Sequence, residues 1–145
     1  ERRHTCPPPG PPVHPWAPQD APAAIALWHA IPGRGLRSVD DSGAGVNKLL
    51  GRSPGLRFVA EAEDGGLMGC VMAGHDGRRG RIYHACVSPE LRNLGLATRL
   101  MDRTLAALKA EGITKVALAC YRDTASGNQF WNARGWTLRP AMTRY

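Results

Sequence analysis

The chain of 145 residues is 43% hydrophobic and 21% charged, which is typical of one soluble globular domain with its own core. No apolar run approaches the roughly 20 residues that cross a bilayer, and no secretory signal pattern opens the chain, so we expect a cytoplasmic protein without a membrane partner. The net charge of +7 would suit a nucleic acid, but the basic residues are dispersed, apart from Arg78, Arg79 and Arg81. We therefore expect no nucleic-acid partner and favour a polyanionic small ligand.

The four cysteines and five histidines show no metal-ligand spacing. No CxxC pair occurs, and Cys70, Cys86 and Cys120 each lie in an apolar, strand-like run, where a free cysteine behaves as a small hydrophobic residue. We therefore expect no bound metal.

The N-terminal part of the chain is expected to lead from a tail into two helices. Residues 1–12 are rich in proline and are expected to form a tail that precedes a single domain over residues 13–145. Residues 13–16 can pair as a short edge strand. Apolar residues at helical spacing then predict helices over about residues 20–31 and 43–50.

An antiparallel meander is expected next. The Asp-Gly step at Asp64 and Gly65 stands between two apolar runs, which predicts a β-hairpin, and a third β run follows over residues 81–87.

The second half of the chain is expected to alternate helices and strands. Residues 95–110 carry an apolar face at helical spacing, and residues 113–121 are apolar enough for a strand buried on both faces. A short helix should end at Gly135, and residues 136–145 can return as a last strand. Strand 81–87, the helix and strand 113–121 form a βαβ unit, whose strands should be parallel. The predicted fold class is α/β with a mixed sheet.

The junction between strand 81–87 and the following helix has the features of an anion site. A helix N-terminus presents free N–H groups and a partial positive charge. Within the run from Arg92 to Ala97, Gly95 leaves room for close approach of a ligand to the backbone, and Arg99 can add charge. The P-loop and dinucleotide glycine patterns are absent. The junction therefore predicts a pyrophosphate site, although R-x-x-G-x-A alone also suits an ordinary helix start.

Two runs of this sequence resemble the GNAT superfamily of N-acetyltransferases. The run HACVSPELRNLGLATRLM, residues 84–101, is similar to its acetyl-CoA-binding signature, in which a strand ends in V-x-P and [QR]-x-x-G-x-[GA] opens a long helix. The run DTASGNQFWNARGWTLR, residues 123–139, resembles the later segment of that family that ends in F-[YW]-x-x-x-G-[FW]. The element order also matches, so the resemblance spans roughly residues 13–145.

The resemblance implies a fold, an activity and a co-substrate. The fold has a central mixed β-sheet with an antiparallel N-terminal meander, parallel middle strands that splay apart, and helices on both faces. The activity is transfer of the acetyl group of acetyl-CoA to a primary amine, by direct attack in a ternary complex. A non-catalytic acyl-CoA-binding module is the alternative function.

The resemblance also places the cofactor-binding residues. The strand end, Ala85, Cys86 and Val87, would give backbone hydrogen bonds to the pantetheine arm and the acetyl carbonyl. Asn128 would contact the arm from the short helix, and the middle strands would splay near Val87 and Tyr121. The pyrophosphate would be held by the Thr98 hydroxyl and by the backbone amides of Arg92, Asn93, Leu94, Gly95, Leu96 and Ala97.

The implied reaction needs a donor for the oxyanion, a base for the ammonium and a proton for the departing thiolate. The Val87 N–H is the expected oxyanion donor. Where the family commonly has a tyrosine as the proton donor, this chain has Trp131, which only donates a hydrogen bond and also suits a core position beside the cofactor. Tyr121 or water could supply that proton.

The identity of the base stays open. If Ala85 faces the cofactor, strand alternation puts Tyr83 and Arg81 on the same side and His84 on the other. Tyr83 is therefore our first candidate for lining the active site, and His84, with an ordinary pKa near 6.5, is expected to be packed. Glu61 on a neighbouring strand is a further candidate base or ammonium partner, or else an exposed strand residue.

The acceptor also stays open. A protein N-terminus, a lysine or a small-molecule amine would each fit. Asp40 and Asp41, between the first two helices, could attract a cationic amine or simply cap a helix. Members of the family often form dimers, so a homodimer is one expectation for the assembly.

Overall fold

In the computed structural model, the described residues are 12–30, 43–52, 54–62, 64, 66–88, 95–119 and 125–139. The elements, in chain order, are β1 (Val13–Pro15), the 3-10 helix η1 (Pro18–Asp20), α1 (Ala21–Ala30), α2 (Gly43–Arg52), β2 (Arg57–Glu61), β3 (Leu67–His75), β4 (Gly80–Val87), α3 (Leu96–Ala110), β5 (Val116–Leu118) and α4 (Ala125–Ala133). Several expectations fall outside the described residues: the tail over 1–11, Asp40 and Asp41, residues 92–94, Tyr121, and the end of the last strand over 140–145.

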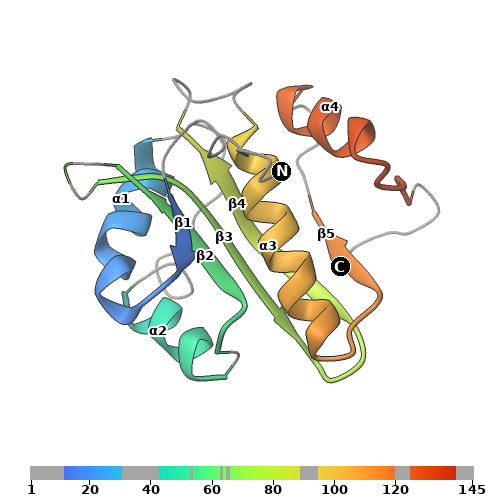
Figure 1. Ribbon diagram of the computed structural model, residues 1–145, viewed down its shortest axis with the longest axis horizontal. Helices are drawn as coiled ribbons and strands as arrows, with labels where there is room; N and C mark the ends of the chain where they lie inside the picture. The colour runs from blue at the N-terminus through green and yellow to red at the C-terminus, as the bar shows by residue number, and fades with distance from the viewer. Residues whose placement is uncertain are drawn as a thin grey trace, which may run out of the picture.

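The five strands form one mixed sheet in the order β1-β2-β3-β4-β5 (Figure 1). Strands β1 to β4 pair antiparallel, and β4 pairs parallel with β5 through the α3 crossover. The predicted meander, mixed sheet and βαβ unit are therefore confirmed. None of the described helices combines the length and the apolar character that crossing a membrane requires.

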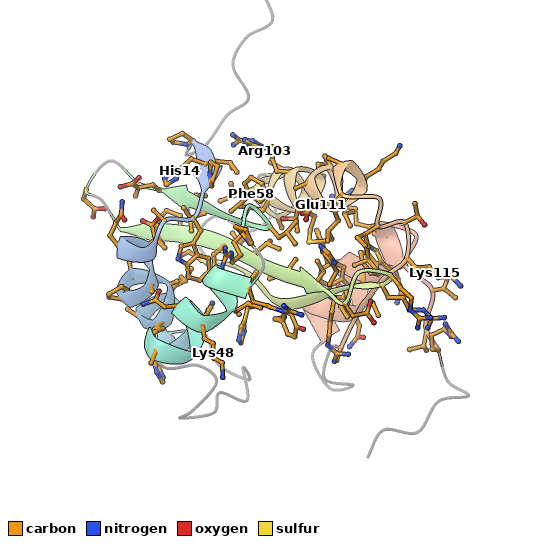
Figure 2. All side chains as sticks on the ribbon, turned by 90° about the horizontal axis from the view of Figure 1, so that it is seen from below. His14, Lys48, Phe58, Arg103, Glu111 and Lys115 are labelled. Carbon is orange, nitrogen blue, oxygen red and sulfur yellow. The ribbon has the colours of Figure 1, made fainter. Side chains whose placement is uncertain are left out.

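Helices cover both faces of the sheet, with α1 and α2 on one face and α3 on the other (Figure 2). Each face has its own core. The cluster on the α1/α2 face comprises Trp16, Ala21, Ala24, Trp28, Val46, Val59, Leu67, Cys70, Met72 and Cys86. The cluster on the α3 face comprises Leu56, Phe58, Ala60, Val71, Ala73, Ile82, Val87, Leu96, Leu100, Met101, Leu108 and Ile113.

Helix α3 is held against the sheet by one apolar face. Leu96, Leu100, Met101 and Leu108 are each 5% exposed or less, and burial of such a side chain contributes about 1.5–3 kcal/mol. Gly69 on β3 allows this close approach, because a Cβ built there would lie 3.0 Å from Leu100 Cδ1. The C-terminal end of β4 and the N-terminal end of α3 lie at the same end of the sheet, where the strand β4 finishes (Figure 1).

Two β-bulges interrupt the strand pairing. On β4, His84 pairs with Met72 and Ile82 pairs with Ala73, so Tyr83 is an extra residue opposite that step of β3. The bulge changes the alternation of side chains. Ile82 belongs to the core on the α3 face, whereas His84, two residues on, stacks on Trp28 on the α1/α2 face.

The β2–β3 hairpin forms at the predicted position, with a second bulge. The Asp64 carboxylate accepts a hydrogen bond from the Gly66 amide at 2.9 Å. Ala60 pairs with Gly69 and Glu61 with Leu67, so one extra residue of β3 lies opposite this step of β2.

Strand β5 differs from its prediction. It spans three residues rather than the nine expected, and its side chains are half-buried or exposed rather than buried on both faces. The physical reason is its position at the edge of the described sheet, where β4 is its pairing partner. Residues 136–139, expected to begin a last strand, have no regular secondary structure.

Candidate active site

The anion site predicted from the sequence would lie at the junction between β4 and α3. Gly95 is the N-cap of α3 and has a left-handed conformation, with φ 77° and ψ 5°, and it makes no side-chain capping bond. This conformation favours glycine. Among the described residues, a Cβ built on Gly95 meets nothing within 4 Å.

The first turn of α3 places the next three predicted residues differently. The side chain of Leu96 is only 2% exposed and packs in the α3-face core, so only its backbone could face a ligand. Ala97 packs partly against the same core. The Thr98 hydroxyl oxygen is buried and has no hydrogen-bond partner among the described residues. A buried hydroxyl without a partner is costly, so the Thr98 hydroxyl is a candidate contact for a ligand oxygen.

The C-terminal half of β4 extends past its parallel partner. In the described residues, pairing between β4 and β5 covers Gly80–Ile82 with Val116–Leu118. Beyond that point β4 continues to Val87, still paired with β3 on its other edge. Ala85, Cys86 and Val87 lie in this extension, and the predicted splay near Tyr121 falls outside the described residues.

Side chains at the end of β4 are packed rather than exposed. Val87 is 7% exposed in the α3-face core, and Ala85 packs partly against the same core. Cys86 lies on the opposite face, with its Sγ 3.6 Å from Cys70 Sγ, and both cysteines are free and buried. What this part of β4 can offer a ligand is therefore mainly its backbone.

The alternation argument that placed Arg81 on the face of Ala85 does not hold across the bulge. Ala85 and Ile82 pack on the same face of the sheet although they are an odd number of residues apart. Tyr83, the bulged residue, is 49% exposed. The expectation that His84 lies on the other face from Ala85 is correct, because its ring stacks on Trp28 with centroids 4.1 Å apart and planes 22° apart.

Glu61 and Tyr83 are not brought together. Glu61 lies at the end of β2, where its Oε2 is 2.8 Å from His14 Nε2. Ala60, next to Glu61, pairs with Gly69, and Gly69 pairs in turn with Val87. Tyr83 precedes Val87 by four residues, which is roughly 13 Å along β4. The backbone carbonyl of Pro15, and then Glu61, raise the pKa of His14 above its ordinary value.

Helix α4 carries the remaining predicted contacts. The side chain of Asn128 is half-buried. Trp131 makes edge-to-face contacts with Phe130 and Trp136, with ring centroids 4.8 Å and 5.4 Å apart, and all three pack against the α3-face core. Trp131 is therefore a packed aromatic residue, which is one of the two positions expected for it.

Sequence reasoning missed two features of the site. Gly69, which lets α3 approach the end of β4, lies in an apolar run with no local signal. The partnership of Trp28 with His84 joins residues 56 positions apart on α1 and β4, and only the strand register reveals it. The contact between an imidazole on β4 and an indole on α1 can be recognised only once the packing of α1 against the sheet is known.

A family model described as "Acetyltransferase (GNAT) family" matches residues 22–136. The chain belongs to this family. An acetyltransferase of Pectobacterium atrosepticum is 36% identical over 104 residues, which is 72% of each chain. Acetyltransferases of Yersinia enterocolitica and Sodalis glossinidius are each 35% identical over 88 residues, and the matches cover 62% and 61% of their lengths.

Solved structures show that this GNAT-family chain has the expected fold. Ard1 from Thermoplasma volcanium superposes with a TM-score of 0.78 at 17% identity, covering 90% of this chain and 85% of that one. AAC(6')-Iy, solved in complex with the bisubstrate analogue CoA-S-monomethyl-acetylneamine, has a TM-score of 0.72 at 16% identity, covering 92% of this chain and 95% of that one. The predicted family and fold are both confirmed.

Proposed function

We propose that this GNAT-family protein transfers the acetyl group of acetyl-CoA to a primary amine within a ternary complex. The observation that carries the proposal is the conformation of Gly95 at the junction between β4 and α3. Gly95 is left-handed and places no side chain of its own in front of the N-terminus of a 15-residue helix. A helix N-terminus carries about half a positive charge and free N–H groups, which suit the diphosphate of coenzyme A.

The residues present fit that diphosphate. The buried Thr98 hydroxyl, which has no partner among the described residues, lies in the first turn of α3 and could donate to a phosphate oxygen. The small Ala97 side chain packs against the core. Arg92, Asn93 and Leu94 would add backbone amides, and Arg92 a positive charge.

The extension of β4 beyond β5 supports the rest of the binding mode. The backbone of Ala85 and Cys86 would bond the pantetheine arm, and Asn128 would contact it from α4. Acetyl-CoA supplies the activated acyl group. The Val87 N–H would donate to the carbonyl oxygen as negative charge develops on it, a contribution that is usually large.

Trp131 does not supply the proton for the leaving thiolate, because an indole N–H is not acidic enough near neutral pH. Tyr121 or a water molecule would take that role. Tyr83, half-exposed on the bulge, would line the acceptor side. Glu61 would act as an ammonium partner only when it is released from His14.

Two measurements test the proposal. Isothermal titration calorimetry with acetyl-CoA should give one site per chain, and absence of binding would refute the proposal. Thiol release from acetyl-CoA is then followed with a tripeptide carrying a free N-terminus, with N-α-acetyllysine, with spermidine and with neamine. Release with at least one amine supports the transferase, whereas tight binding without release supports the acyl-CoA-binding module.

A further inference from the structure

His84 occupies a distinctive position on β4. It directly precedes Ala85, the first of the strand residues proposed to bind the thioester arm, and lies beyond the last pairing with β5 at Ile82. Its side chain lies on the α1/α2 face of the sheet, as its stacking on Trp28 shows. Helix α3, whose N-terminus is the proposed diphosphate site, lies on the opposite face (Figure 2). An acceptor that approaches from the face opposite α3 would therefore meet His84.

The imidazole of His84 has a fixed orientation. Its ring lies 4.1 Å from the ring of Trp28, with the planes 22° apart. Trp28 is fully buried and is itself oriented, because its Nε1–H donates to Cys70 Sγ at 3.2 Å. The His84 side chain is half-buried, so it is ordered by packing without being cut off from solvent, which a residue that exchanges protons requires.

The other described candidates for the base suit the task less well. Tyr83 carries a phenol, which is a weaker proton acceptor than an imidazole. Glu61 is engaged with His14 and lies about two strands away. An imidazole, with an ordinary pKa near 6.5, is the side chain best matched to accepting a proton at neutral pH.

We infer that His84 is the general base that deprotonates the acceptor ammonium, an inference that rests on the proposed acetyl transfer. A ring nitrogen of His84 takes one proton from the ammonium, which frees the lone pair of the amine. The amine nitrogen then attacks the thioester carbonyl carbon, the C–N bond forms, and the C–S bond breaks. The thiolate leaves with the bonding electrons and takes up the second proton lost by the nitrogen. His84 then releases its proton to solvent.

The groups that surround His84 will tune its titration. On β2, the buried cation Arg57 lies in the same cross-strand row, with Met72 between them, and desolvation lowers the pKa of Arg57 to about 10. On the same face are the thiols of Cys70 and Cys86. From α1, Trp28 stacks on the ring, and His29 follows it as an exposed residue.

The kinetic test compares His84→Gln with the wild type, using the amine of the panel that has the highest kcat/KM. The variant should lose on the order of 100-fold in kcat. The acidic limb of the pH profile of kcat, expected between about pH 5 and 8 in the wild type, should disappear. His75→Gln, which removes an imidazole at the far end of β3, is the matched control and should keep both.

Acetyl-CoA binding separates failure of this inference from failure of the proposed function. His84→Gln should bind acetyl-CoA as the wild type does. If the wild type acetylates an amine and His84→Gln keeps its rate and its acidic limb, the inference is wrong while the transferase stands. If no amine is acetylated, the proposed acetyl transfer and the role of His84 are both refuted. If His84→Gln does not fold, His84→Phe, which preserves a ring on Trp28, replaces it with the same expected outcomes.

Tryptophan fluorescence gives a readout that needs no acceptor. A protonated imidazole stacked on an indole quenches its emission, so Trp28 should be quenched as the pH falls through the titration of His84. The difference between the pH titrations of the wild type and of His84→Gln isolates this transition from the other histidines. A difference that stays flat from pH 5 to 8 would show that His84 does not exchange protons in the range where a base must act, and would overturn the inference.

Discussion

Replacing Gly95 by Asp tests the proposed diphosphate site against a control on the same helix. Gly95 and Gly112 bound α3 at its two ends, have φ values of 77° and 82°, and would each place a Cβ in open space. An Asp residue at either position therefore meets the same backbone strain without a clash. Only Gly95 lies at the end that is proposed to bind coenzyme A.

The expected effects on stability and on binding run in opposite directions. The left-handed conformation costs about 1–2 kcal/mol for a non-glycine residue, and the helix dipole favours a carboxylate at the N-terminus and disfavours it at the C-terminus by roughly 0.5 kcal/mol each. Gly112→Asp should therefore be about 1 kcal/mol less stable than Gly95→Asp, which corresponds to a Tm lower by about 4 °C.

Acetyl-CoA binding should show the reverse order. One added negative charge about 5 Å from a phosphate, screened by solvent at this exposed position, costs about 2 kcal/mol, which is roughly a 30-fold loss of affinity. Calorimetric titration of both variants, alongside thermal unfolding, measures both effects. Equal affinities for acetyl-CoA in Gly95→Asp and Gly112→Asp would refute the placement of the diphosphate.

Three further predictions follow from described contacts. Thr98→Val should raise the Tm slightly, because it removes a buried hydroxyl that has no partner among the described residues, and should weaken acetyl-CoA binding on the order of tenfold in calorimetry. Gly80→Ala should destabilise the fold by about 2 kcal/mol in urea unfolding, because its Cβ would lie 3.1 Å from Ile113 Cγ2. Glu61→Gln should lower the pKa of His14 in an NMR titration, because Glu61 is one of the groups that raise it. Since the folded-state pKa of His14 is raised, its contribution to stability is present below about pH 6.5 and is lost as the pH rises through the folded value.

Each of these predictions has a contrary result. A fall in the Tm of Thr98→Val would mean that the hydroxyl already has a structural partner. An unchanged unfolding midpoint for Gly80→Ala would mean that α3 and β5 can move away from β4. An unchanged His14 titration in Glu61→Gln would leave the Pro15 carbonyl as the cause of the raised pKa.

The local parts of the fold followed from sequence. The helix predicted over 95–110 is observed as Leu96–Ala110, and the strand predicted over 81–87 as Gly80–Val87. Helical spacing of apolar residues and the glycine turns that bound these elements are local signals, so a single sequence contains them. The glycine at the start of α3 was predictable for the same reason, because backbone conformation and helix polarity need no distant partner; the anion site placed there stays a prediction.

The rest depended on pairing between distant segments. Nothing in the run RIYHACV marks Tyr83 as an extra residue, because a bulge is defined by the register with β3. The shortness of β5 likewise depends on its position at the edge of the sheet. The assignment of Arg81 to the face of Ala85 therefore failed, because the neighbouring Ile82 packs on that face, whereas His84 and Ala85, beyond the bulge, lie on opposite faces as predicted.

The extra residue in β4 has a consequence for comparison with relatives. Side chains alternate between the two faces of the sheet on either side of Tyr83, but the extra residue shifts that alternation by one position. A relative without this insertion, aligned residue by residue, would be assigned the wrong contacts on one side of that point. Structure-based alignment of this strand should therefore open a one-residue gap at Tyr83 before functional residues are transferred in either direction.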